Sequence, residues 1–436
     1  MRWVLLMALA CGTTKDEESR SNGDTAQSNP QPIEGPLLMA AETTTGELIF
    51  QDTTRDRRAG AQCLTEVHPN RCAKGSQDFR EPCLMFGAVH EIEDGEDILT
   101  ISYTMRDSDV DHAPGAMVRL KPGHPPQIEW IITQLSIPST LQEREGIDCE
   151  ENADEPRCHL YGTHIAVPDP SGEVIVADTS NSRILWVTPP TDGSETGEVK
   201  AVLSQSHPDW DGAEFVNHIQ RIETEDATWL LATFKGQKER DEESINMGRI
   251  MLWDITDRSN PASLWSYPGS GNLAAVHHAS MHETPKGALL LYAHSLGNSA
   301  TASDGAGSVG IAQWNGSDPP IYLADGLLAE ENELGFVRSV AWNDTAGAML
   351  ITDSGCEHGE GVCERDSAIM STKLPTLDPP SLTGAWTEDG RSQNFLELRR
   401  RTLSAPSGLQ MPFSSALFDP DNLGPQLGNV EIGRCP

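Results

Sequence analysis

The chain has 436 residues, and 31 Lys and Arg against 66 Asp and Glu give it a formal net charge of −35. This balance disfavours nucleic acid and an anionic membrane face as partners, because clustered Lys and Arg bind both. Apolar residues make up only 37 % of the chain, whereas Gly (38) and Pro (29) are plentiful. That composition is typical of many short strands joined by turns, and without a sustained helical period it argues against a helical or α/β enzyme.

The first residues indicate export. Trp3 to Ala10 is apolar, follows Arg2 and is too short to span a bilayer, so residues 1–10 are predicted to be a signal peptide. The stretch Ala8-Leu9-Ala10-Cys11 resembles the lipobox of bacterial lipoproteins, which implies lipid attachment at Cys11 and a place in the cell envelope, at the outer membrane. An ordinary signal peptide with a nearby cysteine is the alternative. The polar residues 11–35 are expected to form a flexible tether, so that only the lipid reaches the membrane.

The other cysteines are expected to form disulfides. The chain has nine, and setting Cys11 aside leaves eight, an even number in an exported protein. Two local bridges are predicted, Cys149–Cys158 and Cys356–Cys363; zinc is disfavoured because neither spacing is that of a zinc knuckle. The four that remain are Cys63, Cys72, Cys83 and Cys435. Their simplest pairing is Cys63–Cys72 with Cys83–Cys435, and the sequence leaves the other two pairings open.

An internal repeat predicts the architecture. Its first part is a short segment that often contains His, found at Val89–Ile92, Thr163–Ala166, Asn217–Gln220, His277–Ser280 and Val337–Val340. Its second part is an apolar run, found at Ile98–Ile101, Val174–Ala177, Trp229–Ala232, Leu289–Tyr292 and Met349–Thr352. The unit recurs roughly every 60 residues and holds about four strand-like runs, which is typical of a β-propeller blade.

The two ends of the chain are expected to share a sixth blade. Phe413–Asp419 resembles a first strand and Asn429–Ile432 a second, while Leu37–Ala40 and Glu47–Phe50 supply the other two. The predicted fold class is therefore all-β: residues 36–436 form one monomeric, six-bladed β-propeller of four-stranded blades, closed by both termini. Such closure removes the exposed edges of an open sheet.

One face of this propeller is expected to carry the binding site. The connections between second and third strands are long, and they should share the face on which the first strands begin: 105–115, 234–248, 294–308 and 353–367. The disulfide-containing insertion 135–162 lies on the same face. Within the first loop, Asp107–His112 has carboxylates at alternate positions, as calcium loops do, but a solvated acidic loop explains it better. No metal site and no other cofactor is predicted.

Histidines repeat at the start of the first strands. His90, His164, His218 and His278 are aligned in four repeats, with Arg338 in the fifth and Ser414 in the sixth. A ring of imidazoles and a guanidinium at a channel mouth can grip an anion or act as a nucleophile. The structural alternative is that each ring nitrogen bonds to the backbone of a neighbouring blade. As functional residues we assign His218, His278 and Arg338 to catalysis, and His90, His164 and His277 to ligand binding.

Several stretches resemble known propellers. Thr163–Asp169 and Gly172–Thr179 resemble the repeats of NHL-type propellers. Asp209-Trp210 followed by Asn217-His218, and Val276–His278 before Ala288–Leu291, resemble bacterial arylsulfotransferases. That resemblance implies a six-bladed propeller whose channel histidine passes a sulfuryl group to a phenol.

Two functions of different classes follow. The first is binding of a small sulfated or aromatic ligand at the His/Arg-lined channel mouth, with sulfuryl transfer through a histidine as its enzymatic form. The alternative is a non-catalytic propeller that binds a protein or glycan at the cell surface. Convergence of His164, His218, His278 and Arg338 on one place favours the first, and rings directed into blade interfaces favour the second.

Overall fold

The computed structural model describes nineteen segments of the chain, namely residues 37–42, 47–52, 57–63, 84–93, 96–104, 115–121, 127–149, 158–210, 212–236, 248–267, 276–284, 287–294, 307–316, 319–327, 334–343, 348–354, 368–372, 401–403 and 412–418. The chain divides into residues 1–32 and 33–436, and every described strand belongs to the second unit. The predicted signal peptide and tether, and the acidic loop Asp107–His112, lie outside the described residues. Within the described part, no helix has the length and apolar character needed to cross a membrane.

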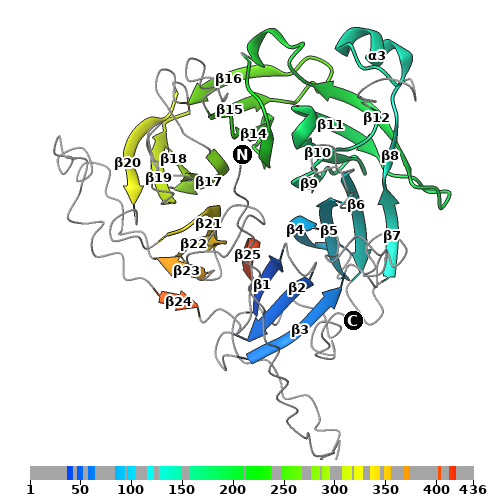
Figure 1. The fold of residues 1–436 in the computed structure, drawn as a ribbon. Coiled ribbons are helices and arrows are strands. Elements are labelled where there is room, and N and C mark those ends of the chain that lie inside the picture. The colour runs from blue at the N-terminus through cyan, green and yellow to red at the C-terminus, as the bar shows by residue number, and fades with distance from the viewer. Residues whose placement is uncertain are drawn as a thin grey trace, which may run out of the picture. The chain divides into compact units, whose positions relative to one another are not determined.

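The described strands form six sheets, numbered here I to VI (Figure 1). Sheet I contains β4 (Leu84–Glu93), β5 (Glu96–Thr104), β6 (Gly115–Lys121) and β7 (Gln127–Ile132). Sheet II contains β9 (Ile165–Pro168), β10 (Val174–Asp178), β11 (Arg183–Thr188) and β12 (Thr196–Leu203). Sheet III contains β13 (Val216–Glu223), β14 (Thr228–Phe234), β15 (Arg249–Asp254) and β16 (Ala262–Tyr267).

The second half of the chain repeats this pattern. Sheet IV contains β17 (Val276–Thr284), β18 (Gly287–His294), β19 (Ser308–Trp314) and β20 (Ile321–Leu327). Sheet V contains β21 (Val337–Asn343), β22 (Ala348–Asp353), β23 (Ala368–Thr372) and β24 (Arg401–Leu403). Sheet VI contains β25 (Pro412–Phe418), β1 (Leu37–Glu42), β2 (Glu47–Asp52) and β3 (Arg57–Cys63). In all six sheets these neighbouring strands pair antiparallel.

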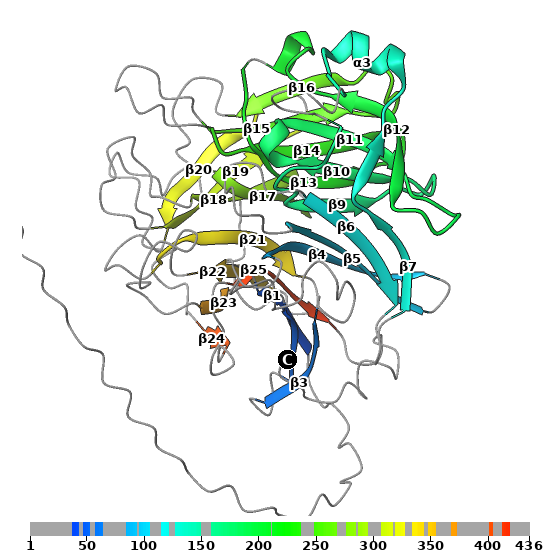
Figure 2. The same cartoon turned by 45° about the vertical axis from the view of Figure 1, so that its right-hand side comes forward.

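The first strands of successive sheets lie next to one another. β4 contacts β9, β9 contacts β13, β13 contacts β17, β17 contacts β21, β21 contacts β25, and β25 contacts β4. Figure 1 and Figure 2 show these strands on the inner side of their sheets, with the fourth strands outermost. Sequential four-stranded antiparallel sheets that meet through their first strands define a β-propeller. The predicted all-β propeller class is therefore confirmed.

The core lies between neighbouring sheets. Strand β10 is buried at every position, because its alternate side chains serve two interfaces. Ile175 and Ala177 belong to a cluster with Leu230 of sheet III, whereas Val174 and Val176 pack with Met117 of sheet I. This double burial explains why the second strand of a repeat is a continuous apolar run rather than an alternating one.

Sheet VI corrects one detail of the prediction. β1 pairs directly with β25, with Ala40 opposite Ser415. The N-terminal part of the sheet therefore has three strands, β1 to β3, and the C-terminal part has one. No place is left between β25 and β1 for Asn429–Ile432, which was predicted as the second strand and lies outside the described residues.

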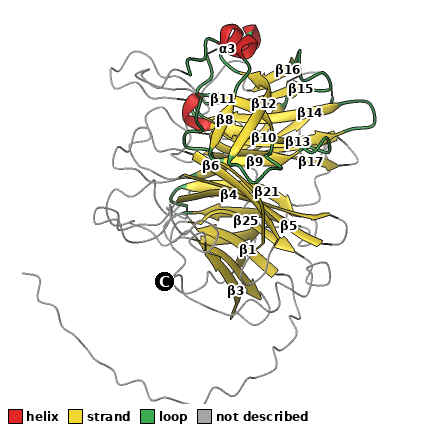
Figure 3. Cartoon of the chain, turned by 90° about the vertical axis from the view of Figure 1, so that its right-hand side faces the viewer, coloured by secondary structure: helices red, strands yellow, loops and turns green. Residues whose placement is uncertain are grey.

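The insertion after sheet I adds two elements that the sequence did not indicate. β8 (Gln134–Ser136) pairs parallel with β12 as a fifth strand of sheet II. Helix α3 (Ser139–Glu145) follows and ends at Gly146, which adopts φ = 62° and donates its N–H to the Gln142 carbonyl. Figure 3 shows how small the helical part is beside the strands. The short 3-10 turns are Thr179–Asn181 and Pro208–Trp210.

Cys149 and Cys158 are joined by a disulfide, as predicted for this insertion. Cys63 ends strand β3, where only the backbone is described. The other cysteines lie outside the described residues, so their pairings remain predictions: Cys11, Cys72, Cys83, Cys356, Cys363 and Cys435.

A buried ion pair anchors the entry to sheet II. Arg183 donates through Nε to Asp178 Oδ2 at 2.7 Å, and both side chains are almost fully buried. The same carboxylate accepts the Tyr161 N–H at 2.8 Å, while Arg183 Nη2 donates to the His159 carbonyl at 3.1 Å. The pair therefore ties the chain before β9 to the turn between β10 and β11.

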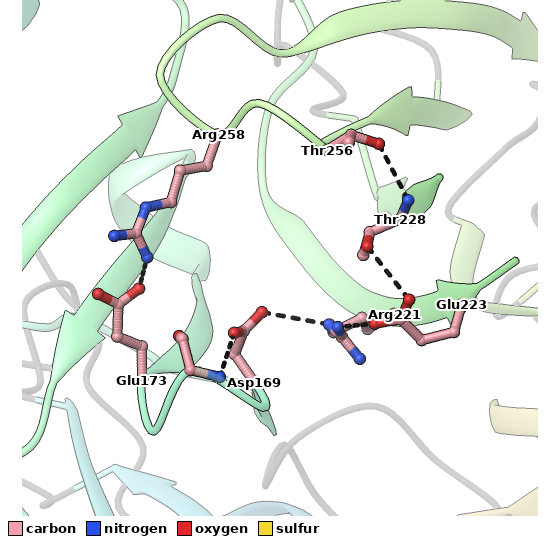
Figure 4. Close-up of polar contacts among 8 residues, drawn as sticks. Asp169, Glu173, Arg221, Glu223, Thr228, Thr256 and Arg258 are labelled. Carbon is pink, nitrogen blue, oxygen red and sulfur yellow. Dashed lines mark hydrogen bonds and ion pairs between the residues drawn. The ribbon is translucent and has the colours of Figure 1, made fainter. Parts of the chain in front are cut away.

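A second set of ion pairs joins sheets II and III at their other ends (Figure 4). Arg221 of β13 donates to Asp169 at 3.2 Å and also pairs with Glu223. Arg258, in the turn after β15, pairs with Glu173, just before β10. Exposed or half-exposed pairs of this kind contribute little stability each.

These two settings give a matched test of stability. We expect Arg183→Met to lower the free energy of unfolding by about 3–5 kcal/mol, because it leaves the Asp178 charge buried without its cation. Arg258→Met should cost only about 1 kcal/mol, because the Arg258 side chain is 41 % exposed and water can replace it at Glu173, which is itself 9 % exposed. Urea unfolding monitored by tryptophan fluorescence measures both. Equal losses in the two variants would contradict this account of sheet II.

Candidate functional site

A β-bulge recurs near the start of the first strands. In β13 the pairing with β14 jumps from Val216 to His218, so Asn217 is an extra residue. In β17 the extra residue is His277, and in β21 it is Arg338. In β4 it is Phe86. A bulge of this kind locally re-aims side chains.

The bulges correct the alignment of the histidines. His218 and His278 are equivalent, because each is the first paired residue after its bulge. Arg338 is instead equivalent to His277 and Asn217, and Ser339 takes the place of His278. His90 lies opposite Leu99, three residues beyond the equivalent position, which Gly87 occupies. The alignment of His90 and Arg338 with His218 was therefore wrong, by three residues for His90 and by one residue for Arg338.

The remaining predicted residues lie as follows. The backbone of His90 is part of β4, and its side chain is not among those described. Ser414 lies in β25, opposite Ala41. Most of the long loops predicted around the site lie outside the described residues, at 105–114, 237–247, 295–306 and 355–367.

His218 and His278 form a close, tilted pair of rings. Their ring centroids are 3.6 Å apart with an interplanar angle of 36°, and both residues are half-buried. Burial lowers the pKa of His218 to about 3, opposed by a hydrogen bond with the Ala279 backbone. Burial also lowers the pKa of His278, and the neighbouring His218 adds to the shift. Both rings are therefore neutral at physiological pH, because burial disfavours the charged form of each ring.

The two rings differ in their contacts. His278 Nδ1 accepts the Val340 N–H of β21 at 3.4 Å. His218 Nδ1 has no hydrogen-bond partner among the described residues, although it is buried.

His277 and Arg338 form a second unit. His277 Nδ1 lies 3.0 Å from the Arg338 carbonyl, and Arg338 Nη1 lies 3.2 Å from His277 Nε2. Arg338 Nε donates to Ser354 Oγ at 3.0 Å, and its guanidinium lies 4.0 Å above the Phe336 ring. Both side chains are almost completely buried. The guanidinium is therefore held from several sides.

His164 meets this unit from another sheet. It precedes β9 of sheet II, yet its ring centroid lies 5.7 Å from that of His277 in sheet IV. Its Nδ1 donates to the Gly162 carbonyl at 2.7 Å. Burial lowers the pKa of His164 to about 3; the Gly162 hydrogen bond opposes this, and the positive charges of Arg338 and Lys235 reinforce it. Two positive charges therefore act on His164, although the chain as a whole carries −35.

Asn217 is a site residue that the sequence analysis missed. It is the bulge residue of β13, only 3 % exposed, and its Nδ2 has no acceptor among the described residues. In the sequence, Asn217 and His277 each directly precede an aligned histidine, and these two polar residues were the available signal.

The described residues contain no group of three or more His, Cys, Asp or Glu side chains that could hold a metal ion. The cluster offers imidazole lone pairs, one guanidinium and an amide. Groups of these kinds form hydrogen bonds and can bind anions.

The sheets and this cluster define the class of the protein as a β-propeller with a polar centre. No protein-family model matches the sequence, and no curated protein matches it. Among solved structures, the chain is similar to the Pseudomonas aeruginosa periplasmic gluconolactonase PpgL, with 11 % identity, a TM-score of 0.42, and coverage of 88 % of this chain and 99 % of that one.

Two further likenesses concern the fold in the same way. The Dos1 propeller is 11 % identical with a TM-score of 0.38, over 74 % of this chain and 71 % of that one. A levansucrase variant from B. megaterium is 10 % identical with a TM-score of 0.40, over 71 % of this chain and 88 % of that one.

The neutral state of His164 predicts a pH dependence of stability. Below its ordinary pKa of 6.5 the unfolded chain takes up a proton that the folded chain refuses until about pH 3. Stability is therefore lost as the pH falls, by about 2 kcal/mol between pH 7 and pH 5 for this residue. His164→Asn should remove this part of the pH dependence. Urea unfolding at pH 7 and at pH 5 measures the free energy of unfolding of both proteins. An identical pH dependence in the variant would show that His164 is not held neutral.

Proposed function

We propose that the chain is a six-bladed β-propeller closed through its termini. The cyclic contacts among β4, β9, β13, β17, β21 and β25 support this, as does the pairing of β1 with β25. Closure matters for function because it brings the bulges of separate sheets around one centre, where side chains distant in sequence can share a ligand.

We infer that this centre binds a small ligand that carries an oxyanion group. The observation that supports it best is the approach of His164 to His277 across sheet III, with Arg338 bonded to His277. Asn217 adds a buried donor without an acceptor, a group that costs free energy unless something accepts its hydrogen. A ligand oxyanion would satisfy such a donor and the positive charge of Arg338 together.

The ligand class that agrees with the resemblance to arylsulfotransferases is an aromatic sulfate ester. His218 would serve as the nucleophile through Nδ1, because burial keeps its ring neutral and Nδ1 has no hydrogen-bond partner among the described residues. Nδ1 forms a bond to sulfur as the bond between sulfur and the aryl oxygen breaks, and the phenolate takes a proton from water. The oxygen of an acceptor phenol then bonds to sulfur, the N–S electron pair returns to Nδ1, and the acceptor proton leaves to solvent.

The alternative remains a non-catalytic propeller that binds a protein or glycan at the cell surface. One observation favours it: ring nitrogens of His277 and His278 bond to the backbone of β21, as a purely structural role requires. In that role the histidines stabilise the contacts between sheets, and binding occurs on the loops.

A panel of variants separates these functions, with 4-nitrophenyl sulfate as donor and phenol as acceptor. We expect His218→Ala to lower the transfer rate at least about 100-fold while binding changes only a few-fold, because the lone pair acts in the reaction step. Arg338→Lys should weaken binding about tenfold, since an ammonium cannot keep the geometry of the fork. The control is His207→Ala. The His207 ring contacts the Pro261 carbonyl and is not part of the cluster.

Calorimetry measures binding, and the absorbance of released 4-nitrophenolate measures turnover. Binding without turnover would exclude sulfuryl transfer and leave the ligand site. No binding by the wild type would exclude both and favour the protein- or glycan-binding alternative. Arg338→Ala is a poorer test, because that side chain is 1 % exposed and its removal leaves a cavity.

We further propose export and lipid attachment at Cys11, with residues 12–35 as the tether. The support is the apolar segment before Ala8-Leu9-Ala10-Cys11 and the polar composition behind it. Growth with radiolabelled palmitate should label the wild-type protein, and Cys11→Ser should carry no label. Label that survives the substitution would contradict lipid attachment at this residue.

A further inference from the structure

We propose that His277 is a positioning residue, which fixes the guanidinium of Arg338 for the bound anion. This inference rests on the ligand site proposed above and changes the role predicted for His277 from ligand contact to support. The observation behind it is that one imidazole meets both the backbone and the side chain of the same residue, Arg338, at 3.0 Å and 3.2 Å.

The two contacts determine the tautomer of His277. A carbonyl oxygen only accepts, so the proton of the ring must be on Nδ1, which faces the Arg338 carbonyl. Nε2 then carries the lone pair, which accepts from Arg338 Nη1. Neither contact survives if the ring flips, so the orientation of His277 and that of the guanidinium depend on each other.

The bulges explain why these two residues meet. His277 is the extra residue of β17 and Arg338 the extra residue of β21, and these strands are neighbours. Because the two bulges lie at the same register, the side chain of His277 reaches the backbone of Arg338. Ser280 repeats this inter-strand contact further along β17, where its hydroxyl donates to the Val340 carbonyl at 2.9 Å.

These contacts orient the guanidinium, and none of the three groups that make them carries a negative charge. His277 accepts as a neutral ring, the Ser354 hydroxyl accepts at 3.0 Å, and the Phe336 ring lies 4.0 Å below. The charge of Arg338 still lowers the pKa of His164 in another sheet. A cation fixed in this way keeps its attraction for an anion and loses less entropy on binding than a mobile side chain.

Asparagine and glutamine separate the two contacts. The amide nitrogen of Asn can take the place of Nδ1, so His277→Asn retains the donor to the Arg338 carbonyl and loses the acceptor for the guanidinium. The amide oxygen of Gln can take the place of Nε2, so His277→Gln retains that acceptor and loses the donor. A purely structural role predicts that Asn is the better substitute in every measurement, because it preserves the backbone bond between the sheets.

If His277 positions Arg338, the two variants should rank in one order for stability and in the opposite order for affinity. We expect His277→Asn to melt within a few degrees of the wild type but to bind 4-nitrophenyl sulfate at least about tenfold more weakly. His277→Gln should melt lower and keep its affinity within about threefold. Differential scanning fluorimetry and calorimetry on the full chain give the two orders. Affinity that follows stability, with Asn above Gln, would overturn the inference.

A second measurement does not depend on the ligand. Phenylglyoxal modifies accessible, mobile guanidinium groups, and mass spectrometry reports the modification of the peptide that contains Arg338. Labelling should rise several-fold in His277→Asn and stay near the wild-type level in His277→Gln. If the wild type binds no sulfate ester while this order holds, the proposed function fails and the positioning role stands. Equal labelling in the three proteins would reject the positioning role.

Discussion

The bulge near the start of the first strands is the constraint on which the polar centre depends. It inserts one residue into an otherwise regular ladder, and in β13, β17 and β21 that residue is Asn217, His277 or Arg338. Each is buried, so its polar atoms need partners that an ordinary strand would not provide. His277 and Arg338 bond to each other, whereas Asn217 Nδ2 has no acceptor among the described residues. The same backbone bulge thus places a histidine that holds Arg338 and an asparagine whose amide N–H lacks an acceptor among the described residues.

The histidines illustrate how burial decides the chemistry of such a centre. A chain of net charge −35 would be expected to stabilise imidazolium, yet burial lowers the pKa of His164 and His218 to about 3. Local desolvation outweighs the distant carboxylates because their field is screened beyond about 8 Å in physiological salt. The lone pairs are therefore kept, and Arg338 supplies the positive charge.

The sequence predicted the propeller class because each repeat contains a continuous apolar run, such as Val174–Ala177. Such a run marks a strand that is buried on both sides. It also aligned His218 and His278 correctly as equivalent positions of two repeats. It could not reveal the bulges, since one inserted residue leaves the hydrophobic pattern nearly unchanged. In sheet VI the first strand and the strands β1 and β2 were predicted, whereas Asn429–Ile432 was wrongly given the second place and β3 was missed. β1 and β25 are far apart in sequence, and register across such a distance leaves no local signal.

Structural and functional roles of these side chains need not exclude each other. A ring that bonds to the backbone of the next sheet, as His277 does, is rigid, and rigidity is what a binding site needs from its supporting residues. The distinction then lies in which atoms are left for a ligand. His278 Nδ1 is occupied by the Val340 N–H, while His218 Nδ1 and Asn217 Nδ2 are not occupied within the described part of the chain. These two atoms, on adjoining residues of β13, are the ones that the proposed ligand site would use.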